Sequence, residues 1–273
     1  MTLLQSILLG IIQGLTEFLP ISSSGHLVIV PYLLGWEIPA DQAFVFDVLV
    51  QVATLAAVIV YFWADLVSIL RAFLSGLWRR RPFDDPQARL GWIILLATLP
   101  AGIAGLLLKD AVEQAFASPA ATAAFLLITA VLLLVAERLG RRNRKVEQLT
   151  WLDALWIGLA QALSIFPGLS RSGATITGGM TRHLERPAAA RFSFLLSIPI
   201  MLAAGLLAGL DLVKMPDVGA LLPTFIPGFI AAAVVGYLSI RWLLSYLSRR
   251  PLYLFSIYCL LAGLVVLGKI FIL

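Results

Sequence analysis

The sequence predicts an all-α polytopic membrane protein built as an inverted-topology repeat, with six full transmembrane helices and two re-entrant helix–loop–helix segments. The 273 residues are 60% hydrophobic and only 13% charged, whereas soluble domains carry about 45–50% apolar and about 25% charged residues. Apolar stretches long enough to cross a bilayer recur along the chain, and two polar segments rich in Pro, Gly and Ser interrupt them. A water-soluble fold is therefore excluded, and we expect one membrane domain over residues 1–273.

Basic residues are concentrated in four connections, and their positions predict which side of the membrane each connection faces. The basic connections lie at 71–89, 138–145, 182–191 and 241–250, and the positive-inside rule places them in the cytoplasm. The connections at 36–42, 109–118 and 211–219 carry at most one lysine each, so we expect them outside. The net charge of +5 thus follows from topology, and we expect no nucleic-acid partner.

Full spans fit this topology at 44–63, 91–108, 120–137, 192–210, 223–241 and 252–271. Segments 2–30 and 151–183 do not fit, because each would begin and end on the same side of the membrane. Each contains a helix-breaking run, PISSSG at 20–25 and PGLSRSG at 167–173. Non-helical backbone at membrane depth survives only where protein or a polar cavity surrounds it. We therefore expect two re-entrant pairs of half-helices that line a site.

Alignment of the chain with itself indicates an internal duplication. It places Gly10 on Gly158, Gln13 on Gln161, Ser22 on Ser170, Ser24 on Ser172 and Gly25 on Gly173. Repeat one then covers about 1–140 and repeat two about 151–273. Each copy has one re-entrant pair and three spans, and this odd number of crossings inverts the second copy. Inverted repeats with broken helices place their site near the midplane, so residues 22–26 should face residues 170–175.

The ionisable residues expected within the bilayer are Glu17, His26, Asp47 and Arg171. A charge at this depth costs about 2.5–3.5 kcal/mol on insertion scales, so such residues are normally paired or functional. Glu17 and Arg171 are the natural pair, either as a structural salt bridge or as part of a site. His26 either caps a helix or acts as a general acid or base. Asp47 is either a solvated cap or a site residue.

Hydroxyl side chains surround these charges at the start of each second half-helix. The set comprises Ser22, Ser23, Ser24, Ser170, Ser172 and Thr175. Hydroxyls, free backbone amides and the positive end of a helix dipole form an anion cradle. Arg171 adds the bidentate geometry that suits phosphate oxygens. The pattern therefore favours a phosphate ligand over a cation or a neutral solute.

These residues resemble a known family, the undecaprenyl pyrophosphate phosphatases first noted as bacitracin-resistance proteins. The first motif is QGLTE at 13–17, continuing as FLPISSSGH at 18–26, and the second is PGLSRSGAT at 167–175. The resemblance covers essentially the whole chain. It implies hydrolysis of undecaprenyl pyrophosphate to undecaprenyl phosphate and inorganic phosphate, which recycles the lipid carrier for peptidoglycan synthesis and gives bacitracin resistance.

The resemblance also implies a multi-pass protein of the bacterial inner (plasma) membrane, in contact with membrane lipid, whose site faces the periplasm or cell exterior. A divalent cation, Mg²⁺ or Ca²⁺, is expected to assist. Many family members have glutamate at the position of Gln13, so a metal or proton role moves here to Glu17. The exposed faces of the spans leave room for a homodimer.

The expected site assigns catalytic roles to Glu17, Ser23, His26, Ser170 and Arg171, and substrate binding to Gln13, Ser22, Ser24, Asp47, Ser172 and Thr175. The nucleophile is either a water activated by Glu17 or a serine, Ser23 or Ser170, with His26 moving the proton. The alternative function is a secondary transporter or lipid-phosphate flippase, because broken helices in inverted repeats are common in transporters. The cluster of serines around Arg171 favours hydrolysis.

Overall fold

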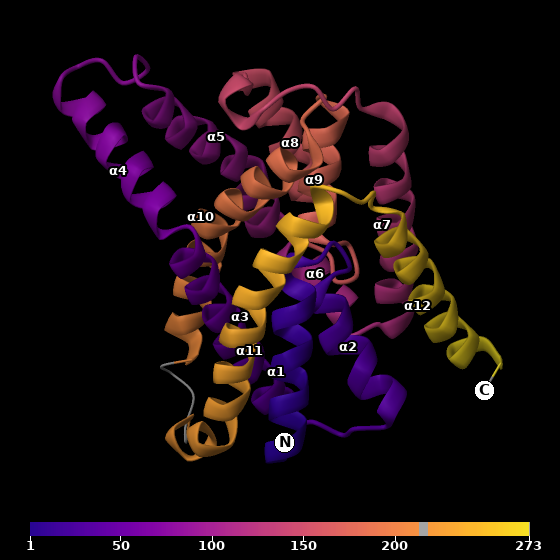
Figure 1. The fold of residues 1–273 in the computed structure, drawn as a ribbon. Coiled ribbons are helices and arrows are strands. Elements are labelled where there is room, and N and C mark those ends of the chain that lie inside the picture. Colours follow the sequence, from indigo (N-terminus) through magenta and orange to yellow (C-terminus); the bar gives the residue numbers. More distant parts are fainter. Residues whose placement is uncertain (213–217, 273) are drawn as a thin grey trace.

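The computed structural model describes residues 1–212 and 218–272, and these residues form helices joined by short connections, with no β-strand among them (Figure 1). Six of the described helices are long and apolar enough to cross a membrane. They are α3 (Ala40–Tyr61), α5 (Pro86–Leu107), α7 (Pro119–Leu139), α10 (Arg186–Leu212), α11 (Val218–Leu247) and α12 (Tyr253–Ile272). They coincide with the six predicted spans, so the prediction of an all-α polytopic membrane protein is confirmed.

Two pairs of short helices occupy the segments that contain the predicted breaks. The first pair is α1 (Leu3–Phe18) and α2 (Ser23–Leu34), and the second is α8 (Trp151–Leu163) and α9 (Arg171–Thr181). Capping boxes begin α1 at Thr2 and α8 at Thr150. The four helices have 11 to 16 residues and are therefore about 16–24 Å long, less than a bilayer core of about 30 Å. Their re-entrant placement in a membrane stays a prediction.

Two further helices lie where the sequence suggested only connections. The basic connection at 71–89 is largely helical, because it includes the end of α4 (Trp63–Trp78) and the beginning of α5. The helix α4 begins directly after α3 and packs on α5. Gly91 of α5 allows this approach, since a Cβ there would lie 3.1 Å from the Phe73 ring. The connection at 109–118 contains the short helix α6 (Lys109–Phe116). Of the connection at 211–219, residues 213–217 lie outside the described part of the chain.

The basic connections meet at one end of the molecule and are joined by polar contacts. Arg89 donates to the Leu149 carbonyl at 2.9 Å, and Arg144 donates to the Arg182 carbonyl at 2.9 Å. The Leu252 amide, after the last basic connection, donates to Glu137 at 2.8 Å. These contacts, made by residues in or directly beside the four connections, agree with the prediction that the connections share one side of the membrane.

The two halves of the chain interlock. α1 packs on α11, α8 on α5, α7 on α12 and α3 on α10, so each long contact joins one half to the other. At two of these contacts the backbones touch: a Cβ on Gly10 would lie 2.2 Å from the Gly228 carbonyl oxygen, and one on Gly158 would lie 2.6 Å from that of Ala97. Each half has a short pair followed by three long helices, with α4 and α6 added in the first. The internal duplication itself stays a prediction.

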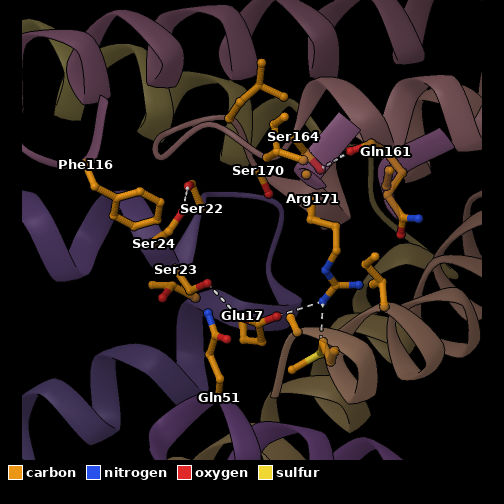
Figure 2. Close-up of a pocket in the computed structure, with 18 residues that line it drawn as sticks. Glu17, Ser22, Ser23, Ser24, Gln51, Phe116, Gln161, Ser164, Ser170 and Arg171 are labelled. Carbon is orange, nitrogen blue, oxygen red and sulfur yellow. Dashed lines mark hydrogen bonds and ion pairs between the residues drawn. The ribbon is translucent and has the colours of Figure 1, made fainter. Parts of the chain in front are cut away.

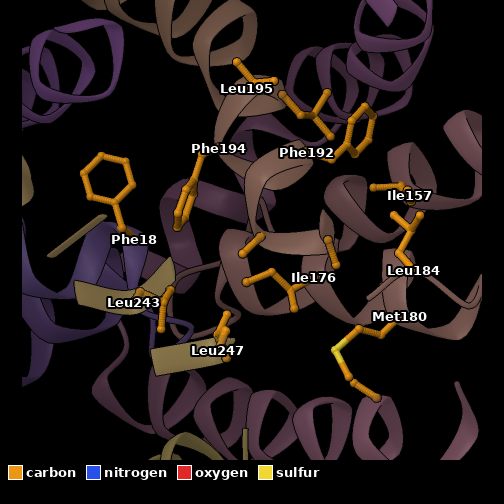
Figure 3. Close-up of a cluster of buried hydrophobic side chains, with 14 of the residues drawn as sticks. Phe18, Ile157, Ile176, Met180, Leu184, Phe192, Phe194, Leu195, Leu243 and Leu247 are labelled. Carbon is orange, nitrogen blue, oxygen red and sulfur yellow. The ribbon is translucent and has the colours of Figure 1, made fainter. Parts of the chain in front are cut away.

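The largest cluster of buried apolar side chains draws on both halves (Figure 3). Phe18, at the end of α1, meets Phe194 of α10 edge to face with ring centroids 5.4 Å apart. Ile176 and Met180 of α9 lie in the same cluster. This packing fixes the end of α1 and the body of α9, and therefore the two breaks beside them.

Candidate active site

The two helix breaks lie against each other. The Ser22 hydroxyl accepts hydrogen bonds from the Gly25 amide at 3.2 Å and from the Gly168 amide of the other break at 3.1 Å. The Ser172 hydroxyl donates to the Leu19 carbonyl at 3.1 Å. Gly168 has φ +93°, and a Cβ there would lie 2.1 Å from the Thr122 carbonyl oxygen, so only glycine fits. The expected meeting of the breaks is thus present in the structure.

A cavity of about 290 Å³ lies between the breaks (Figure 2). Its polar lining comes from both helix pairs and from α3, and its apolar lining comes from α5, α6, α10 and the second break. The polar side chains are Thr16, Glu17, Ser22, Ser23, Ser24, Gln51, Gln161, Ser164, Ser170 and Arg171. A concave cavity with several converging polar groups is the usual form of a small-molecule site.

Glu17 is the centre of the hydrogen-bond network in this cavity. Its Oε2 accepts from the Ser23 hydroxyl at 2.5 Å and from Gln13 Nε2 at 3.1 Å, while its Oε1 accepts from Arg171 Nη2 at 2.8 Å. The Glu17 and Arg171 side chains are 8% and 15% exposed. The predicted pair of charges is therefore present, and it faces a cavity rather than lying in a closed core.

Arg171 keeps hydrogen-bond donors for an anion. A guanidinium has five N–H donors, and the contacts of Arg171 to Glu17 and to the Met201 sulfur both use Nη2. Arg171 is also the first residue of α9, where the helix dipole is positive. Ser170 caps that helix, because its hydroxyl accepts from the Gly173 amide at 3.0 Å. These groups can bind phosphate oxygens.

Five of the predicted site residues do not line the cavity. Thr175 lies behind it, where its hydroxyl donates to the Arg171 carbonyl at 2.8 Å, and Ser172 is turned toward Leu19. Gln13 reaches the site only through Glu17. Asp47 is on α3 one turn before Gln51, on the same face of the helix but about 6 Å away along its axis, and of the two only Gln51 lines the cavity.

His26 is the fifth of these residues. Its ring lies on the far side of Ser22, between the Ser22 carbonyl and the Tyr258 hydroxyl.

The cavity residues that sequence reasoning missed include Gln51, Phe116, Gln161 and Ser164. Gln161 is 1% exposed, and its Oε1 has no hydrogen-bond partner among the described residues. The alignment that places Gln13 on Gln161 was a signal for this residue. Phe116 closes α6, an element that the sequence did not predict, and lies beside Ser24 in Figure 2.

The residues present fit a divalent cation only as partial ligands. Glu17 is the one carboxylate on the described cavity wall, and the described residues contain no group of three or more His, Cys, Asp and Glu that could hold a metal. Mg²⁺ commonly binds through one or two carboxylates, waters and substrate phosphates. Glu17 and the hydroxyls of Ser22, Ser23 and Ser24 suit that kind of shared site.

Comparisons with known proteins agree over nearly the whole chain. The family model described as Bacitracin resistance protein BacA matches residues 6–265. The chain is 46% identical over 278 residues to a protein of Chlorobium phaeovibrioides named Undecaprenyl-diphosphatase, covering 98% of this chain and 96% of that one. Proteins of the same name from Thermomicrobium roseum and Myxococcus xanthus are 44% and 42% identical, covering 98% of this chain in each case and 98% and 89% of the relatives.

Proposed function

The chain belongs to the bacitracin resistance protein BacA family, and we propose on that premise that it hydrolyses undecaprenyl pyrophosphate to undecaprenyl phosphate and inorganic phosphate. This activity recycles a lipid carrier of cell-wall synthesis. The single observation that best supports it in the structure is the cavity where Ser23 and Arg171 both contact Glu17. The alternative of a transporter or lipid flippase is not favoured, since the relatives bear the name of a hydrolase.

We propose that Ser23 is the nucleophile. Its hydroxyl donates to Glu17 at 2.5 Å, so Glu17 can take the proton as Ser23 Oγ attacks the terminal phosphorus. The bond to the bridging oxygen breaks, undecaprenyl phosphate leaves, and Ser23 carries the phosphoryl group. After Glu17 has released this proton to bulk water, it takes a proton from the water molecule that attacks the phosphoserine, and inorganic phosphate is released. Ser170 is a weaker candidate, because its hydroxyl accepts from Gly173 and is 3.1 Å from Ser172 Oγ.

Phosphoryl transfer depends mainly on positioning and on neutralising charge. Arg171 and the beginning of α9 would bind the terminal phosphoryl oxygens, with Ser22, Ser24, Gln51 and Gln161 along the rest of the pyrophosphate. The leaving group is a phosphate, a stable anion that needs no proton, so no acid is required at the distant position of His26. A divalent cation shared by Glu17 and the pyrophosphate would neutralise further charge.

We also propose that this is a multi-pass protein of the bacterial inner membrane whose site opens to the periplasm or cell exterior. Phe116 supports this orientation, because it belongs to the connection predicted outside and lines the cavity, while the basic connections meet elsewhere. Exposed apolar side chains such as Leu206 of α10 and Leu261 of α12 would contact membrane lipid. A homodimer would use the same membrane-facing surfaces.

The test is phosphate release from undecaprenyl pyrophosphate by purified protein in detergent with Mg²⁺, which needs no second compartment. We expect release by the wild type, a loss of at least about 100-fold in Glu17→Gln because the general base is removed, and no change in Glu37→Gln, an exposed glutamate of the α2–α3 connection. Absence of release by folded wild type would contradict the function. Full activity of Glu17→Gln would leave the function standing and remove Glu17 from the reaction.

A further inference from the structure

The His26 side chain is held between two partners on different parts of the chain. Its Nδ1 lies 2.7 Å from the Ser22 carbonyl oxygen, and its Nε2 lies 2.6 Å from the hydroxyl of Tyr258 on α12. The two rings are nearly parallel, with 11° between their planes and centroids 5.6 Å apart. His26 is only 5% exposed, so these contacts decide the orientation of its ring.

These partners select one tautomer of the imidazole. A carbonyl oxygen only accepts, so Nδ1 carries the hydrogen. The neutral ring then has a lone pair at Nε2, which accepts a hydrogen bond from the Tyr258 hydroxyl. The other histidine has the opposite arrangement, because His183 Nδ1 accepts from the Arg141 amide at 3.3 Å. Its hydrogen therefore lies on Nε2.

Ser22, the residue that His26 holds, has an unfavourable backbone conformation and a central place in the site. Its φ is +71°, in the left-handed region that non-glycine residues rarely adopt. Its hydroxyl accepts the amide hydrogens of Gly25 and Gly168 and so ties the two breaks together. The next residue is Ser23, which donates to Glu17. The backbone at Ser22 therefore sets the direction of the Ser23 hydroxyl.

We infer that Tyr258 is a positioning residue for the reaction: through the Nδ1–H tautomer of His26 it holds the Ser22 backbone in the conformation that points Ser23 at Glu17. This inference rests on the proposed function and deepens it. It also assigns His26 a positioning role, which agrees with its place behind the cavity wall. Loss of the Tyr258 hydroxyl should then affect the chemical step and leave the phosphate-binding groups in place.

The first test compares Tyr258→Phe with Tyr253→Phe. Both tyrosines are on α12 and 42% exposed, but the Tyr253 hydroxyl has no hydrogen bond among the described residues. We expect Tyr258→Phe to lower kcat about tenfold, the effect of one ordinary hydrogen bond, with KM nearly unchanged, and Tyr253→Phe to behave as wild type. In a His26→Ala background, Tyr258→Phe should have no further effect, because the two residues act in series. Equal kcat values for the wild type and Tyr258→Phe would overturn the proposal.

The second test observes the tautomer directly by ¹⁵N NMR of histidine-labelled protein in detergent. The chain has only two histidines, and His183→Gln assigns their signals. We expect His26 to be protonated on Nδ1 in the wild type and to show mixed or mobile ring signals in Tyr258→Phe. A wild-type His26 protonated on Nε2, or signals unchanged by Tyr258→Phe, would overturn the proposal. This measurement needs no substrate, so it stays decisive even if the protein releases no phosphate.

Discussion

At the scale of single residues, Ser23 and Ser24 are neighbours on the same cavity wall and differ in one contact. Ser23 donates to Glu17 at 2.5 Å, while Ser24 has, among the described residues, only a long contact of 3.4 Å to the Ser22 hydroxyl. The carboxylate can therefore activate one of these hydroxyls and not the other. Substituting each serine in turn therefore distinguishes an effect on the chemical step from an effect on substrate binding.

We predict that Ser23→Ala lowers kcat at least about 100-fold, because the nucleophile is lost. Ser24→Ala should raise KM a few-fold with kcat largely kept, because only a binding hydroxyl is removed. Both are measured by phosphate release, and a rapidly quenched wild-type reaction should contain phosphoserine at Ser23. Equal kcat losses in the two variants, or phosphate on another serine, would exclude Ser23 as the nucleophile.

The sequence predicted the paired charges of the site better than its amide side chains. A lone charge in the bilayer is so unfavourable that Glu17 and Arg171 had to be paired or functional, and the structure pairs them. Gln51 and Gln161 carry no such signal, because an uncharged amide is tolerated on an apolar helix. The prediction of Asp47 did not locate the cavity wall on α3, since the position of a cavity along a helix depends on how the other helices pack around it. His26 illustrates the same limit, because Tyr258 is 232 residues away.

At the scale of helices, close backbone contact is the feature that positions α1, and through it Glu17. A Cβ on Gly10 would lie 2.2 Å from the Gly228 carbonyl oxygen of α11. Backbone atoms cannot move aside as a flexible side chain can. The contact between α1 and α11 therefore tolerates no larger residue at this position.

We predict that Gly10→Ala lowers the free energy of unfolding by about 1–3 kcal/mol or more, because the added methyl forces the helices apart. The control is Gly102→Ala on α5, where a Cβ would meet nothing within 4 Å. That change should be stabilising by about 0.5–1 kcal/mol, as expected for alanine in a helix. Thermal unfolding in detergent measures both. Equal stability of the two variants would show that α1 can shift away from α11 at little cost.

Most helices could be predicted from the sequence, and the two exceptions have a physical reason. The six long apolar helices follow from hydropathy and charge. α4 contains Arg71 within an apolar helix, and α6 carries Lys109, Asp110 and Glu113 in eight residues, so composition indicated connections in both places. α4 nevertheless packs on α5. Contacts of this kind are made by tertiary structure and have no local signal.

At the scale of the whole molecule, the site exists only where the two halves meet. Glu17 comes from the first half and Arg171 from the second, and α1 and α8 both pack on a helix of the opposite half. Neither half alone buries these surfaces or pairs these charges. Separating the two halves should therefore abolish both the fold and the site, and bringing the halves together should restore both.

We predict that fragments 1–141 and 142–273 are each unstable alone and become active when produced together. A separated fragment leaves Glu17 or Arg171 unpaired, at a cost of about 2.5–3.5 kcal/mol for a charge in the bilayer. The measurement is co-purification through a tag on one fragment, followed by phosphate release. A fragment that is monodisperse and thermally stable on its own would show that the halves fold independently.

The pairing of distant helices also has a consequence in time. Ribosomes release the chain from its N-terminus, and Arg171 follows Glu17 by 154 residues. At about 5–20 residues per second, roughly 8–30 s pass before the carboxylate can meet its guanidinium. The partner of α1, α11, begins only at Val218 and is completed later still. The first helix to be made is thus among the last to reach its final contacts. During synthesis the polar break between α1 and α2 must be kept out of lipid until the second half of the protein has been made.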